Sequence, residues 1–143
     1  MTPPRPILKL GWALHKALFR VTGGRVGTQR AGDGLGTLFL LSTGRTTGAI
    51  RRNGLFYIEV GPNFVVVASN AGENVDPNWW RNLKAKADAI IEIGTRKVSV
   101  RARAAAADEA ARLWPRLDAA NPEYAAYRRK ATREIPVVIL EPR

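Results

Sequence analysis

Short apolar runs, each ended by glycine-rich or charged residues, recur along the chain from residue 38 onward. Apolar runs of about four to eight residues bounded by such turn residues are typical of β-strands. The pattern predicts strands over residues 38–41, 55–60, 64–68, 89–93, 97–104 and 135–140. Gly61-Pro62-Asn63 separates the second run from the third, and Gly94-Thr95-Arg96 separates the fourth from the fifth. Both separators predict hairpins.

Helical signals lie between and beyond these runs. Asp76-Pro77 is typical of a helix start, and Asn121-Pro122-Glu123 begins a further helix. Residues 107–117 follow a helical pattern despite Pro115, and residues 7–21 are also helical in pattern. Hairpin connections dominate over crossovers in this order of about six strands and four helices. The order therefore favours an α+β fold in which a mainly antiparallel sheet closes as a small barrel with helices around it.

The composition divides the chain into two parts. Residues 1–36 are predicted to hold a basic helix and a glycine-rich connector, and residues 37–143 to form the barrel domain. The net charge is +11, and residues 1–53 hold nine Lys or Arg against one acid, a net of +8. This charge indicates an anionic partner, which is a nucleic acid, an anionic lipid or a polyanionic small molecule.

The predicted N-terminal helix is amphipathic and basic. At about 100° per residue, cationic side chains form a stripe opposite an apolar one. The cationic stripe consists of Arg5, Lys9, Lys16 and Arg20. Two interpretations stay open: a helix packed on the barrel with a solvated basic face, or a helix that docks residues 5–20 on an anionic membrane surface. A secretory signal is disfavoured because His15 and Lys16 interrupt the apolar stretch.

The stretch after residue 41 combines glycines, hydroxyls and arginines. It reads STGRTTGAIRR from Ser42 to Arg52 and contains no acid. Backbone N–H groups freed by Gly44 and Gly48, four hydroxyls and three guanidiniums suit a phosphate or carboxylate. The loop has neither a Walker arrangement nor a dinucleotide-binding GxGxxG pattern. The alternative of a solvated loop between two strands therefore stays open.

Side chains for direct catalysis are scarce. The chain has no cysteine and one histidine, and its carboxylates are scattered without metal-ligand or paired spacing, so we predict no metal site. An enzyme built on this sequence needs a bound cofactor for the difficult step. Candidates for lining a flat pocket, or else ordinary core residues, are Trp79, Trp80, Tyr124 and Tyr127. Nucleic-acid binding is disfavoured because no RRM, KH or helix-turn-helix signature is present.

Five motifs follow one another in an order that is more specific than any one of them. They read STGRTTGAIRR, FVVVASNAG, DPNWWRNL, NPEYAAYRR and IPVVILEP, within residues 38–142. This ordered set resembles the deazaflavin-dependent nitroreductase and quinone reductase family. The resemblance implies a split β-barrel that binds the 8-hydroxy-5-deazaflavin coenzyme F420. It also implies transfer of a hydride from the reduced coenzyme to a quinone or a nitroaromatic compound.

The resemblance further implies roles for individual residues. Coenzyme-binding positions are Thr43, Gly44, Arg45, Thr47, Gly48, Arg51, Ser69, Asn70, Trp79 and Asn82. Positions that orient the reacting ring and the acceptor are Ser69, Tyr124 and Tyr127. Departures from the family pattern are Thr46 in place of a basic residue, Ile50 in place of a proline, and Asn121 where some members carry a tyrosine. The first two concern binding of the coenzyme tail, and the third concerns the choice of acceptor.

These inferences lead to one expectation and one alternative. We expect a cytoplasmic reductase, peripheral to the membrane if its N-terminal helix docks there, that uses coenzyme F420 rather than FMN. The alternative is a non-enzymatic module on the same barrel that binds a lipid, a fatty acid or another small ligand.

Overall fold

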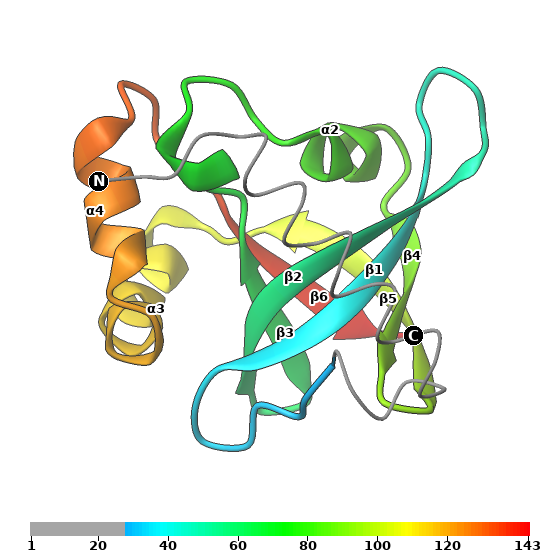
Figure 1. Cartoon of the computed structure of the whole chain (residues 1–143), viewed down its shortest axis with the longest axis horizontal. Helices are drawn as coiled ribbons and strands as arrows, with labels where there is room; N and C mark the ends of the chain where they lie inside the picture. Colours follow the sequence, from blue (N-terminus) through cyan, green and yellow to red (C-terminus); the bar gives the residue numbers. More distant parts are fainter. Residues whose placement is uncertain (1–27) are drawn as a thin grey trace.

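A closed barrel of six antiparallel strands forms the centre of the computed structural model, which describes residues 28–143 (Figure 1). The strands follow the order β1-β2-β3-β6-β5-β4 around the barrel. Their bounds are β1 Gly36–Thr43, β2 Ile50–Val60, β3 Asn63–Val67, β4 Asp88–Ile93, β5 Arg96–Ala104 and β6 Val137–Pro142. The helical elements are η1 Asn70–Gly72, α2 Asn78–Ala85, α3 Ala107–Ala120 and α4 Glu123–Lys130. The predicted α+β barrel with mainly antiparallel strands is confirmed.

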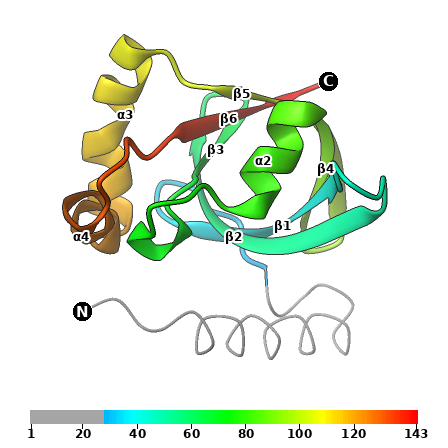
Figure 2. The same cartoon turned by 90° about the horizontal axis from the view of Figure 1, so that it is seen from above.

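Alternate residues of each strand face the barrel interior, as the two-residue period of a strand requires. The interior cluster includes Leu38, Leu40, Tyr57, Phe64, Val66, Ile91, Val100, Ala102, Val138 and Leu140. α2 lies across one end of the barrel (Figure 2) and adds Trp79, Trp80 and Leu83 to this cluster. These three side chains are at most 6% exposed. Their burial fixes α2 in place, so its polar face is held rigidly at that end of the barrel.

α3 and α4 form a second layer on the outside of β3 and β6 (Figure 2). The buried residues of this outer cluster are Ile58, Val65, Val67, Leu113, Leu117, Tyr124, Ile135, Val137 and Ile139. The Arg128 guanidinium of α4 donates to both carboxylate oxygens of Asp118 in α3, at 2.8 and 2.6 Å. The two helices are thus tied to each other as well as to the sheet.

β2 begins earlier than the apolar pattern predicts, at Ile50 rather than at residue 55. The ladder with β1 continues past the apolar residues to the pair Thr43 and Ile50. Polar residues extend it because backbone hydrogen bonds hold a β-ladder. The connecting β1–β2 loop is therefore residues 44–49 only, and Arg51 and Arg52 point to opposite faces of a strand.

α3 also extends further than predicted, from Ala107 through Pro115 to Ala120. Pro115 removes one backbone donor from the helix. Leu113 and Leu117 on either side of it are 6% and 1% exposed. Burial of these flanking leucines accounts for a helix that continues through the proline.

The predicted basic helix over residues 7–21, with its membrane-docking stripe at residues 5–20, lies outside the described part of the chain. Within residues 28–143, no helix is long and apolar enough to cross a membrane.

Candidate functional site

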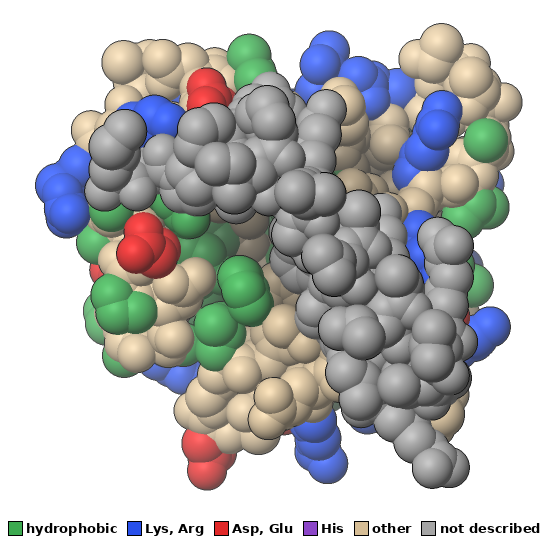
Figure 3. All heavy atoms as spheres, viewed as in Figure 1, with side chains coloured by type: hydrophobic (Ala, Val, Ile, Leu, Met, Phe, Trp, Pro, Cys, Tyr) green, Lys and Arg blue, Asp and Glu red, His purple; other side chains and the backbone are tan. Residues whose placement is uncertain are grey.

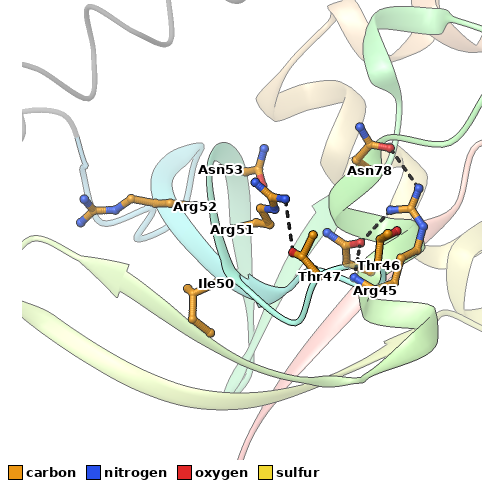
Figure 4. A pocket seen from close by; sticks show the side chains of 10 residues that line it. Arg45, Thr46, Thr47, Ile50, Arg51, Arg52, Asn53 and Asn78 are labelled. Carbon is orange, nitrogen blue, oxygen red and sulfur yellow. Dashed lines mark hydrogen bonds between the residues drawn. The ribbon is translucent and has the colours of Figure 1, made fainter.

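A cavity of about 660 Å³ lies between the β1–β2 loop and α2 (Figure 4). Its lining residues are Gly44, Arg45, Thr46, Thr47, Ile50, Arg51, Arg52, Asn53, Asn78 and Asn82. These lining residues include three arginines, three asparagines and two threonines but no carboxylate. Lys and Arg side chains also gather on the surface over this loop (Figure 3). The cavity thus has the chemistry of an anion site.

Internal hydrogen bonds fix the β1–β2 loop. The Gly44 N–H donates to the Ala49 carbonyl at 2.7 Å, and the Gly48 N–H donates to the Gly44 carbonyl at 2.8 Å. Thr47 Oγ1 accepts from the Ala49 N–H at 3.2 Å and from Arg51 Nη2 at 3.5 Å. A Cβ at Gly44 would lie only 3.1 Å from the Ala49 carbonyl oxygen, which favours glycine there. The amides of Gly44 and Gly48 themselves therefore donate within the loop, so any backbone N–H groups that bind an anion belong to other residues of the loop.

Two asparagine side chains hold Arg45 against α2. Arg45 donates to Asn82 Oδ1 from Nη1 at 2.7 Å and from its backbone N–H at 3.2 Å. Its Nη2 donates to Asn78 Oδ1 at 3.4 Å (Figure 4). Asn82 is only 4% exposed, so this contact anchors the loop to a buried point of α2. Both acceptors are neutral amides, so neither of them offsets the positive charge of the Arg45 guanidinium at the cavity.

Arg51 is the second cation of the cavity with only a neutral partner. Within residues 28–143, its guanidinium bonds the Thr47 hydroxyl, and neither Arg51 nor Arg45 forms an ion pair. Arg52 differs, because it points away from Arg51 (Figure 4) and bonds Glu92 at 2.6 Å. Of the three guanidiniums expected to bind an anion, two thus keep an uncompensated charge. Like charges on one cavity repel each other, which favours an anionic ligand between them.

A second group of expected site residues lies on the other side of α2. Figures 1 and 2 place α4 and the β1–β2 loop on opposite sides of that helix. Ser69 precedes η1, Asn70 begins it, and η1 contacts α4. At Gly72, a Cβ would lie 3.2 Å from both Cα and the carbonyl oxygen of Tyr127 and 3.1 Å from Lys130 Cδ. The loop after β3 therefore packs directly against α4 at Tyr127.

The two tyrosines of α4 differ in burial. Tyr124 is 5% exposed, and this burial raises its pKa to about 12. Tyr127 is half-buried, and burial raises its pKa as well, with a smaller contribution from the charge of Glu123. Both hydroxyls therefore keep their proton near neutral pH. Of the two side chains, Tyr127 is the more accessible to a ligand.

The site residues expected from the sequence lie in the cavity, in the adjoining loop, in the barrel core and in the group at α4. The cavity lining contains Gly44, Arg45, Thr47, Arg51 and Asn82. The remaining positions of the loop motif are Thr43 at the end of β1 and Gly48 within the loop. Trp79 lies in the barrel core at 6% exposure. The group beside α4 contains Ser69, Asn70, Tyr124 and Tyr127.

Two lining residues, Asn53 and Asn78, were not expected from the sequence. The spacing of each from an expected site residue would have placed it on the same side of its helix or strand. Asn78 precedes Asn82 by one helical turn, and Asn53 follows Arg51 by two residues on a strand. Ser42 is the opposite case, because its hydroxyl was expected at the anion site, yet the residue is 1% exposed and lies outside the lining.

Known proteins share both the sequence and the fold of this chain. The family described as F420H(2)-dependent quinone reductase matches residues 12–142. A quinone reductase of that name from Mycobacterium tuberculosis is 35% identical over 130 residues, covering 89% of this chain and 87% of that protein. A solved F420-H2 dependent reductase, FDR-A, matches this structure with a TM-score of 0.68 at 30% sequence identity. The match covers 73% of this chain and 93% of the FDR-A chain. A structure described as a domain-swapped dimer has a TM-score of 0.72 at 25% identity, covering 93% of this chain and 99% of its own. The family resemblance of the five motifs is thus confirmed, and this chain belongs to the F420H(2)-dependent quinone reductase family.

Proposed function

We propose that this protein binds the reduced form of coenzyme F420 and uses it to reduce a quinone to the quinol. Membership of the family supports the coenzyme and the class of acceptor. The structural observation that carries the proposal is the cavity in which Arg45 and Arg51 have only neutral partners. The alternative of a non-enzymatic lipid-binding module is not favoured by this family membership.

The cavity fits the anionic part of the coenzyme. Coenzyme F420 carries a phosphate and an acidic oligoglutamate tail, and guanidiniums form charge-assisted hydrogen bonds with both groups. Arg45 and Arg51 supply these donors, and the side-chain amides of Asn53 and Asn78 line the same space. Because Thr47 and the loop backbone already hold Arg51 and its surroundings, little ordering is needed when the anion binds.

Bound reduced coenzyme F420 supplies the hydride, and the protein supplies orientation, an apolar surrounding and a proton. Ser69 and Asn70 are assigned to orient the reacting ring at the edge of the barrel. Trp79 and Trp80, each 6% exposed, close the end of the barrel with apolar surface and so keep water out of the barrel interior. The Tyr127 hydroxyl, which is protonated near neutral pH, donates to the quinone oxygen on which negative charge develops. The quinone gains the hydride and one proton, which passes from the Tyr127 hydroxyl, and becomes the quinol, while Tyr127 takes a proton back from water.

Nitroaromatic compounds belong to the same proposed class of acceptor. A nitro group, like a quinone, places negative charge on an oxygen when it receives a hydride. The half-buried Tyr127 hydroxyl can donate to either oxygen, which supports the extension.

A fluorescence titration with coenzyme F420, with FMN as control, tests the proposal. We expect coenzyme F420 to bind in the micromolar range or more tightly. FMN should bind much more weakly, because it carries a phosphate but no oligoglutamate tail. Oxidation of the reduced coenzyme should then follow on addition of menadione. If neither compound binds, the reductase proposal fails and the lipid-binding alternative takes its place.

A further inference from the structure

The loop after β3 holds Ala71 in a left-handed backbone conformation that alanine does not favour. Asn70, Ala71 and Gly72 have φ angles of 46°, 55° and 81° in succession. Glycine adopts this left-handed region freely, but alanine has no side-chain reason to do so. Such a conformation persists only where the surrounding structure imposes it, and it concentrates at functional sites.

Arg133 supplies contacts that impose it. Its Nη2 donates to the carbonyls of Ala68 and Ser69 at 3.0 and 3.1 Å. Its Nε donates to the Glu73 carbonyl at 2.9 Å, and its Nη1 donates to Asp76 at 2.9 Å. The side chain is only 16% exposed. One guanidinium therefore binds the backbone on both sides of the left-handed residues.

The same loop is fastened to α4 at its other edge. Gly72 abuts Tyr127, and Lys130 Nζ lies 3.6 Å from Glu73 Oε1. The Thr132 N–H, just before Arg133, donates to Asn74 Oδ1 at 2.7 Å. The segment that follows α4 thus runs alongside the loop and holds it close to the tyrosine.

We propose that Arg133 is a positioning residue, which holds the left-handed loop of residues 69–73 against α4 and thereby fixes the separation of Ser69 from Tyr127. Its catalytic consequence rests on the proposed function, in which these two residues orient the coenzyme ring and the acceptor. Arginine is required because its planar fork donates to several carbonyls and a carboxylate at once. A lysine ammonium donates from a single point at the end of a flexible chain.

Arg133→Lys tests the proposal against Arg128→Lys as a matched control. Both arginines are partly buried and bind a carboxylate, but Arg128 binds Asp118 of α3 and stacks on Trp114 at 3.9 Å, away from the loop. Arg133→Lys should lower kcat about tenfold or more, the scale expected from misplaced reacting groups. Coenzyme affinity should fall much less than kcat, because the arginines proposed to bind the anionic part of the coenzyme lie in the cavity on the other side of α2. Arg128→Lys should leave kcat unchanged, even if it lowers thermal stability.

Hydrogen exchange gives a readout that does not depend on the coenzyme. The N–H groups of Gly72 and Glu73 donate within the loop at 2.9 and 3.0 Å. Both should exchange faster in Arg133→Lys and at the wild-type rate in Arg128→Lys. Adding Ala71→Gly to Arg133→Lys should restore part of kcat, since glycine adopts the left-handed conformation without Arg133.

The outcomes separate this proposal from the proposed function. Unchanged exchange at the two amides, or an equal loss of kcat in both lysine variants, overturns the positioning role. If the Gly72 and Glu73 amides exchange faster in Arg133→Lys but the wild-type protein shows no turnover, the structural role of Arg133 in the loop stands. The reductase proposal is then the one that is overturned.

Discussion

Two arginine-containing regions flank α2 and use their charge in opposite ways. In the cavity, Arg45 and Arg51 donate to neutral amide and hydroxyl oxygens. On the other side of the helix, Arg133 bonds the carboxylate of Asp76 and three backbone carbonyls. The first region leaves positive charge for a ligand. The second pairs its charge with a carboxylate and uses its geometry to hold the backbone.

Burial follows the same division. Arg45 and Arg51 are exposed, whereas the Arg133 side chain is 16% exposed. Water solvates an exposed guanidinium, so leaving it without an acid costs little free energy. A buried guanidinium needs acceptors in all directions, because desolvation of its charge is otherwise unfavourable. An arginine that is exposed, oriented by neutral groups and adjacent to a cavity is therefore a candidate for binding a ligand.

The largest expected effect follows from removing one cation of the cavity. Arg51→Ala should weaken coenzyme F420 binding by about 1.5–3 kcal/mol, or about 10- to 150-fold in Kd, as for the loss of a charge-assisted hydrogen bond. Wild-type binding should also weaken with added salt, since the interaction is between charges. A fluorescence titration at two salt concentrations measures both effects.

Arg103→Ala is the matched control for this change. The Arg103 side chain on β5 is also solvent-accessible, at 41% exposure, but it is paired with Glu109 at 2.6 Å. Its removal should lower protein stability and leave the coenzyme Kd unchanged. Equal binding by the Arg51 and Arg103 variants would remove Arg51 from the coenzyme site.

The second prediction concerns the two tyrosines of α4, where we expect an effect on turnover and not on coenzyme binding. Tyr127→Phe keeps the ring and removes only the hydroxyl. It should raise the barrier by about 1–3 kcal/mol, about 5- to 150-fold in kcat with menadione, if that hydroxyl donates to the developing oxyanion. Tyr124→Phe should have a smaller effect, because Tyr124 is 5% exposed. Wild-type turnover in both variants would show that neither hydroxyl takes part in the chemistry.

The third prediction concerns a variant that gives Arg45 a carboxylate partner, as Arg133 already has. In Asn82→Asp, the carboxylate replaces an oxygen that already lies 2.7 Å from Arg45 Nη1. The new ion pair neutralises Arg45 and should weaken coenzyme binding by about 1 kcal/mol without unfolding the protein. Asn78→Asp should act in the same direction but less, since its contact is longer at 3.4 Å. Tighter coenzyme binding by Asn82→Asp would contradict the assignment of Arg45 to the anion.

The fold was predictable because the information for it is local. Each strand was visible as its own short apolar run, and a hairpin such as that at Gly61 follows from the turn residues between two runs. Closure into a barrel followed from the short connections. The start of β2 was missed because Ile50 to Asn53 are held by backbone pairing with β1, which leaves no apolar pattern in the sequence.

The site was less predictable, because its geometry depends on contacts distant in sequence. The basic loop was visible as a motif, but the bond between Arg45 and Asn82 joins residues 37 apart. The contact from Arg133 to Ala68 spans 65 residues. Such pairs form only after the barrel closes and α2 is seated on it. The opposite directions of Arg51 and Arg52 likewise required knowledge of the strand boundary.

The smallest expected effect concerns the ion pair between Arg103 and Glu109, which contributes to stability and not to coenzyme binding. Glu109, in the first turn of α3, accepts from Arg103 Nη1 and Nη2 at 2.6 and 2.9 Å and from the Ala106 N–H at 3.2 Å. These bonds, chiefly those from Arg103, lower the pKa of Glu109 from 4.5 to about 2. Because the folded-state pKa lies below the unfolded one, the stabilisation is complete above pH 4.5 and is lost as the pH falls toward 2.

Glu109→Gln should therefore lower the free energy of unfolding by about 0.5–1 kcal/mol at pH 7, a modest value because water screens this partly exposed pair. Urea unfolding at several pH values should show the gap between variant and wild type closing as the pH falls from 4.5 toward 2. Asp108→Asn is the control, since its pair with Arg112 at 3.3 Å is 77% and 71% exposed and should contribute nothing measurable. Coenzyme affinity should match wild type in both variants, because this pair lies outside the cavity. A gap that stays constant down to pH 2 would show that Glu109 acts through its shape and not through its charge.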